Sequence, residues 1–106
     1  VVETSPEAVL TNNSSNQDLY TFDSLVLRSA TMNYSITRDT GVRHGSFRVV
    51  PTGGGTLTYD DDYVEDQTVG VTLSASQSGD DVTIKYTTTN TGVDGSITFS
   101  ISTFRV

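Results

Sequence analysis

The chain has 106 residues, of which 34% are hydrophobic, and it contains no cysteine. Its formal net charge is −7 at pH 7, with six basic residues scattered along the sequence. This length predicts one small domain, and the absence of thiols excludes disulfides and cysteine-bound metals. The acidic charge disfavours nucleic acid and anionic membrane surfaces as partners, and no apolar run approaches the roughly 20 residues needed for membrane insertion as a helix.

The first third of the chain predicts short strands between polar turns. Residues 1–7 contain Pro6 and no alternation of apolar and polar side chains, so we expect an irregular linker or stalk junction there. Residues 8–106 are predicted to form a single β-sandwich domain. The turn-forming segments around residues 11–18 and 23–24 separate three expected short strands, at 8–10, 19–22 and 25–28.

Alternation with a period of two residues is clear from Thr31 to Arg38. Met32, Tyr34 and Ile36 are separated by small polar residues, which predicts a strand with one face in a core. The following Asp39-Thr40-Gly41 predicts a turn in which the glycine adopts a positive φ. Beyond it we expect a strand at 46–50, a loop at Pro51–Gly55, a strand at 56–59 and an acidic connection at 60–68.

The last third, Val69–Phe104, predicts three consecutive antiparallel strands joined by two short turns. Apolar residues alternate with Thr, Ser or Lys in each segment, as they do at Val82, Ile84 and Tyr86. Thr suits such strands because its branched Cβ fits the pleat and its hydroxyl tolerates water. About eight short strands without a helical pattern predict an all-β fold, an antiparallel β-sandwich of jelly-roll-like type.

One motif raises the question of catalysis. Asp39-Thr40-Gly41 matches the aspartic-protease triplet, but polar residues stand where an apolar strand should precede it, which favours a hairpin turn. A glycosidase needs two carboxyls in a cleft, for which so small an apolar core leaves scant room. We therefore predict a protein that is not an enzyme and needs no cofactor.

The densest acidic segment is a candidate metal site. Asp60, Asp62 and Glu65 carry hard oxygen ligands that suit calcium. The spacing does not match the helix–loop–helix calcium motif, because no glycine stands at the sixth position of the loop. A solvated acidic loop without metal is the alternative.

The tyrosines and the single histidine are candidates for binding. Tyr34, Tyr59 and Tyr86 are in phase with apolar neighbours and are predicted to lie in the core. Tyr20 and Tyr63 are freer, and exposed tyrosines can stack on sugar rings. A lone imidazole next to Arg and Gly is expected to be exposed.

Five segments of the chain resemble a C-terminal β-domain that recurs in virion proteins of tailed bacteriophages, at the tips of tail fibres and related appendages. They are Tyr34–Arg38, Gly45–Val49, Asp61–Glu65, Gly70–Ser74 and Val82–Asn90. The resemblance extends over roughly residues 22–104, and its motifs are those of strands and turns.

This resemblance implies a trimeric knob on the exterior of the virion that attaches to a host-surface receptor, such as a glycan. A thin core also favours an oligomer that shares burial. Loop tips are the usual place for binding, here 39–44, 51–55 and 90–95. The candidate receptor-binding residues are Tyr20, Asp39, Arg43, His44, Tyr63, Asn90 and Asp94. A structural capping or capsid-decoration domain, or a carbohydrate-binding module of a secreted protein, are the alternatives, and the lack of Trp speaks against the last.

Overall fold

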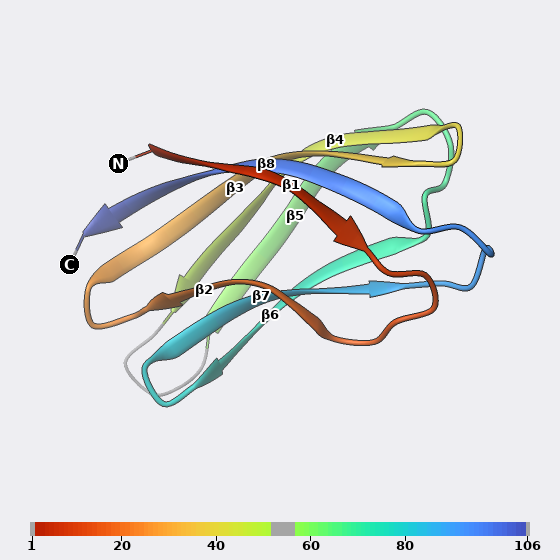
Figure 1. Ribbon diagram of the computed structural model, residues 1–106. Helices are drawn as coiled ribbons and strands as arrows, with labels where there is room; N and C mark the ends of the chain where they lie inside the picture. The colour runs from red at the N-terminus through yellow and green to blue at the C-terminus, as the bar shows by residue number, and fades with distance from the viewer. Residues whose placement is uncertain (1, 52–56, 106) are drawn as a thin grey trace.

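The computed structural model describes residues 2–51 and 57–105, which form eight strands in two antiparallel sheets (Figure 1). The strands are β1 (Val2–Leu10), β2 (Gln17–Asp23), β3 (Leu27–Arg38), β4 (Gly41–Pro51), β5 (Leu57–Glu65), β6 (Val71–Ser78), β7 (Asp81–Thr88) and β8 (Gly95–Arg105). One sheet has five strands in the order β1-β8-β3-β4-β5, and the other has three in the order β2-β7-β6. The predicted all-β sandwich is confirmed. The described residues contain no helix with the length and hydrophobicity to cross a membrane.

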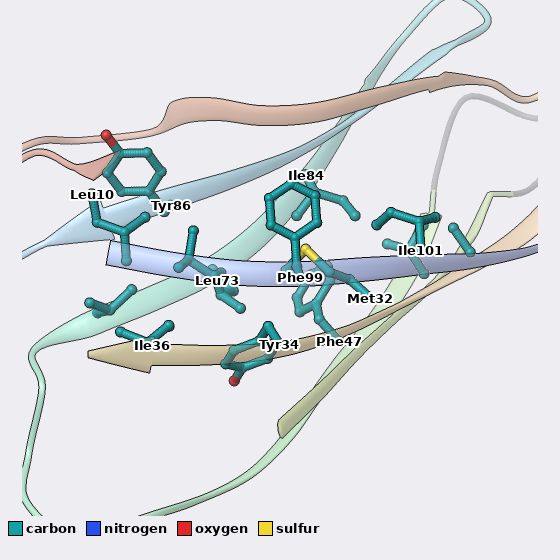
Figure 2. Close-up of a cluster of buried hydrophobic side chains, with 14 of the residues drawn as sticks. Leu10, Met32, Tyr34, Ile36, Phe47, Leu73, Ile84, Tyr86, Phe99 and Ile101 are labelled. Carbon is teal, nitrogen blue, oxygen red and sulfur yellow. The ribbon is translucent and has the colours of Figure 1, made fainter. Parts of the chain in front are cut away.

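The core lies between the two sheets and follows from the alternation of side chains. Met32 and Ile36 on β3 and Phe47 on β4 are fully buried, and Figure 2 shows Met32, Phe47 and Phe99 gathered in one cluster. Val82, Ile84 and Tyr86 enter the same core from the three-stranded sheet. Full burial of such a side chain stabilises the fold by about 1.5–3 kcal/mol, so these strand faces hold the sheets together.

The predicted three-strand unit at the end of the chain is divided between the sheets. β6 and β7 pair from Val71↔Thr88 to Ser78↔Asp81, as expected. β8 instead pairs with β1 and β3, so the prediction that all three strands are neighbours is wrong. Alternation determines which side chains of β8 face the core, but it does not determine the sheet in which the strand lies.

The sandwich is elongated, with a longest dimension of 40 Å, and its two ends differ. One end, which we call the distal end, carries the connections 11–16, 39–40, 66–70 and 89–94 (Figure 1, right). The opposite, proximal end carries Val2, Arg105 and the turns 24–26 and 79–80 (Figure 1, left). The ends of the described chain and the cluster of long connections therefore lie on opposite sides of the core.

Two predictions for the beginning of the chain need correction. Residues 2–10 form a strand, paired from Val2↔Ser102 to Leu10↔Gly95, where irregular structure was expected up to residue 7. The register shifts between Ser5 and Ala8, an interruption of the ladder of the kind that accommodates a proline. Residues 24–26 form a turn, so the strand expected at 25–28 begins only at Leu27. The stalk junction itself stays a prediction.

The prediction of an acidic connection at 60–68 is also wrong for its first part, because β5 continues to Glu65. Its acids face basic residues of β4: Asp60 stands opposite Arg48 and Glu65 opposite Arg43. Opposite charges at facing positions stabilise a strand pair, which explains why so acidic a segment is extended. In the turn before β4, Asp39 has the positive φ of 55° that was expected for Gly41; Asp is among the residues that tolerate this conformation.

Candidate functional site

A buried arginine ties the distal connections together. Arg38 ends β3 and is only 4% exposed. Its guanidinium donates hydrogen bonds to the carbonyl oxygens of Val93 (3.0 Å), Val69 (3.0 Å), Gly70 (3.2 Å) and Thr89 (2.7 Å), and to Oδ1 of Asn12 (2.7 Å). Its partners therefore come from three of the four distal connections.

These bonds use all the hydrogen-bond donors of the Arg38 guanidinium. A guanidinium has five N–H groups, and the five acceptors match that number. Arg38 forms no ion pair with any carboxylate of the described residues, so neutral carbonyl dipoles solvate its charge. We conclude that Arg38 organises the distal connections and has no donor left for a ligand.

Asn12 is the second organising residue. Its Oδ1 also accepts a bond from the Thr91 amide (2.9 Å), and its Nδ2 donates to Oδ1 of Asn90 (3.0 Å). The backbone N–H of Asn12 donates to Oδ1 of Asp94 (2.8 Å). Asn90 and Asp94, both predicted receptor residues, thus lie together at the distal end, next to the connection 11–16, which was predicted as a turn but not as part of a binding site. An Asn-rich loop was visible in the sequence, but its partners are about 80 residues away.

A small hollow lies between these connections. Its volume is about 120 Å³, and it is lined by residues 38–41, 67–69, 91 and 93. Thr40 donates a hydrogen bond to Oε1 of Gln67 across it (3.1 Å), and Asp39 and Thr68 are exposed beside it. Small-molecule pockets usually have volumes of about 300–1,000 Å³, so this hollow suits a single polar group of a larger partner.

Arg43 is a structural residue that contacts the ring of Tyr63, whereas Tyr63 itself is 43% exposed on β5. Arg43 is only 3% exposed, which contradicts its prediction as a receptor residue in a loop. Its Nε lies 3.0 Å from Oε2 of Glu65, its Nη1 donates to the Val71 carbonyl (2.8 Å), and its Cζ lies 3.9 Å from the centroid of the Tyr63 ring. Arg43 therefore links β4 to β5 and to β6 of the other sheet, and Tyr63 presents one ring face to it.

The pKa values of two side chains beside Arg43, Tyr34 and Asp61, are shifted from their ordinary values. The hydroxyl of Tyr34 donates to Oδ1 of Asp61 at 2.7 Å. Burial, more than any other cause, raises the pKa of Asp61, and the bond from Tyr34 and the charge of Arg43 partly oppose it. Burial also raises the pKa of Tyr34, and the carboxylate of Asp61 adds to that effect. Tyr34 is therefore a neutral donor at physiological pH, and the pair braces β3 against β5.

The other predicted residues lie apart from the distal end or from one another. His44 is exposed on the outer face of the five-stranded sheet, beside a shallow depression of about 310 Å³ that Ser35 and Thr98 also line. Tyr20 is half-buried on β2, and Tyr59, predicted as core, is 45% exposed at the edge strand β5. Within the loop expected at 51–55, Pro51 belongs to β4, and residues 52–55 lie outside the described residues.

The candidate calcium ligands do not converge. Asp60 lies 3.0 Å from Nη2 of Arg48, whereas Glu65 is bound to Arg43. Asp60 and Asp62 are exposed, and the odd-numbered positions of β5, including Glu65, turn toward the other face. No group of three or more His, Asp or Glu side chains within residues 2–51 and 57–105 is placed to hold a metal ion.

Comparison with known proteins gives little further information. No protein-family model and no curated protein matches the chain. Among solved structures, the tailspike protein of Acinetobacter baumannii phage AM24 aligns with 98% of this chain and 23% of its own chain, at 16% sequence identity and a TM-score of 0.33. The chain thus spans less than a quarter of that tailspike, and a TM-score this low supports no inference about function.

Proposed function

We propose that this chain is a non-enzymatic module from the exterior of a tailed-bacteriophage virion, a trimeric fibre tip that attaches to a receptor on the bacterial surface, such as a glycan. The resemblance of its strand and turn segments to fibre-tip domains motivates this proposal. The observation that carries it is the separation of the two ends of the sandwich: Val2 and Arg105 lie at the proximal end, and four connections gather at the distal end (Figure 1). A fibre attached at the proximal end would hold the distal end toward the host.

The construction of the distal end supports a role in recognition. Arg38 fixes its connections through buried and half-buried hydrogen bonds, and Asn12 adds an exposed bond from the Thr91 amide. Exposed Asp39, Thr68 and Asn90 then project from a pre-organised backbone. Rigid loops lose less conformational entropy on binding than mobile ones, and hydroxyl, amide and carboxylate groups together can donate to and accept from the hydroxyls of a sugar.

Binding to whole cells tests the proposal. Fluorescent beads that carry the chain through its proximal end should bind some strains in a panel of bacteria. Thr68→Arg should abolish that binding, because it places a long cation at the distal hollow. The matched control is Thr58→Arg, another exposed threonine, near the proximal start of β5, which should bind as the unmodified chain does.

Three results would count against the proposal. They are beads that bind none of the strains, binding to purified phage capsids in place of cells, and equal losses for the two arginine variants. Capsid binding would favour a capping or decoration domain.

A further inference from the structure

The proximal end carries exposed apolar side chains that nothing in the described chain covers. Leu25 is 67% exposed and Val26 49% exposed in the turn before β3, and Phe104 is 70% exposed near the end of β8. Phe104 pairs with Ser29, and the next pair joins Arg105 to Leu27, so β8 ends beside that turn. Exposed apolar side chains gathered in one region of a small domain commonly mark a contact surface.

Charges of opposite sign flank this apolar region on the two sheets. On the five-stranded sheet, Arg28 and Arg105 are exposed and form no ion pair with the described residues. On the three-stranded sheet, Asp23 stands directly opposite Asp81, and the backbone N–H of Ser24 bonds to the carbonyl of Asp80. Like charges at facing positions destabilise a strand pair, so Asp23 and Asp81 would gain from a nearby cation, and the exposed Asp80 lies in the turn next to them.

We propose that the proximal end is a surface through which copies of this chain associate. In this contact the arginines of the five-stranded sheet of one copy face the aspartates of the three-stranded sheet of the next, and Leu25, Val26 and Phe104 are buried between them. The two charged sides complement each other, so the arginine side of each copy lies against the aspartate side of another, in a two-fold pair or in a closed ring. The inference rests on the oligomer of the proposed function and names its contact surface.

Charge pattern distinguishes this partner from others. An orientation that placed the same residues of two copies together would bring Arg105 against Arg105 or Asp81 against Asp81, at a cost in electrostatic repulsion. A purely basic or purely acidic partner would satisfy one side of the surface and leave the other unpaired. A second copy, oriented so that its aspartates face the arginines of the first, provides charges of both signs.

Sedimentation equilibrium across the micromolar range tests the inference. The unmodified chain should associate, and more weakly at high salt because exposed charges are screened. Phe104→Ser, Arg105→Glu and Asp81→Arg should each weaken association by about tenfold or more, equivalent to 1.4 kcal/mol. The double variant Arg105→Glu/Asp81→Arg should recover association, because the exchanged charges again face each other between copies. Val64→Ser, at a valine of β5 that is 79% exposed and lies away from the proximal end, is the matched control and should leave association unchanged.

The outcomes separate this inference from the proposed function. An unmodified chain that is monomeric at every concentration would overturn the inference, as would a double variant that associates no better than its parents or a Val64→Ser variant whose association is as weak as that of Phe104→Ser. The charge variants lie at exposed positions, and circular dichroism verifies that they fold. Beads present many copies whatever the state in solution, so bacterial binding and sedimentation fail independently.

Discussion

Nη2 of Arg38 donates a 2.7 Å hydrogen bond to Oδ1 of Asn12, joining the last residue of β3 to the first connection between the sheets. The same amide oxygen receives the backbone N–H of Thr91. One side-chain oxygen thus connects three parts of the distal end, and its bond to a cation is of the stronger, charge-assisted kind.

The first prediction concerns this link. Arg38→Met should lower the free energy of unfolding by about 2–4 kcal/mol, because the carbonyl and amide oxygens around the guanidinium lose their donors. Urea denaturation measures the change. Arg48→Met, which removes the exposed ion pair with Asp60, is the control and should cost less than about 1 kcal/mol. Equal effects of the two substitutions would show that the buried bonds do not organise the distal end.

The second prediction concerns pH and Asp61. Its pKa is raised in the folded state, chiefly by burial, so the folded chain holds this proton at a higher pH than the unfolded chain does. The contribution of Asp61 to stability is therefore fully present below its unfolded pKa, near the ordinary value of 3.8, and is lost as the pH rises through the raised folded value. Asp61→Asn should remove this component from the stability profile measured by urea unfolding at several pH values. A profile unchanged by the substitution would contradict it.

The third prediction concerns Tyr34 at alkaline pH. Burial raises its folded pKa above the ordinary value of 10.0, so its contribution to stability is present below pH 10 and declines as the pH rises above that value. Tyr34→Phe should shift the alkaline unfolding transition to higher pH, even though it loses the bond to Asp61 and about 1 kcal/mol at neutral pH. Circular dichroism during an alkaline titration measures the shift. A transition that moves to lower pH would contradict this reasoning.

The fourth prediction concerns the close contact of β4 and β5. A Cβ atom at Gly45 would lie 2.6 Å from Cβ of Tyr63 and 2.9 Å from the hydroxyl of Tyr34. Gly45→Ala should therefore destabilise the protein by about 1–3 kcal/mol, as overpacking does. Gly79→Asn is the control, because nothing lies within 4 Å of a Cβ there and Asn tolerates the positive φ of 60°. Thermal unfolding should rank Gly45→Ala well below the control, and the reverse order would contradict the packing described.

The sequence predicted the strands whose side chains alternate cleanly and little of what joins them. Met32, Tyr34 and Ile36 are buried as expected, because apolar residues that recur with a period of two lie on one face of a strand. A strand was predicted at 56–59, but the acidic remainder of β5 was missed, because its carboxylates are typical of a loop unless they face the arginines of β4. The sheet to which β8 belongs depends on β1 and β3, both distant in sequence.

The candidate site was predictable only in part, for a related reason. Asn90 and Asp94 were identified as loop residues, and they do lie at the distal end. Arg43 was expected to be exposed because it was assigned to the loop tip 39–44, yet it is buried in contact with Glu65, Tyr63 and Val71. Arg38 and Asn12 gave no local signal, because every partner that defines their roles comes from a distant connection.

Mapping of contacts in solution tests the central claim most directly, namely that recognition takes place at the distal end. Backbone amide resonances of the chain would be followed by NMR during titration with an envelope extract from a bacterial strain that the beads bind. We expect the perturbed amides to cluster in residues 11–16, 39–40, 66–70 and 89–94, with the proximal turns unchanged. Perturbations centred on the outer face of the five-stranded sheet around His44, or on the proximal end, would contradict the account.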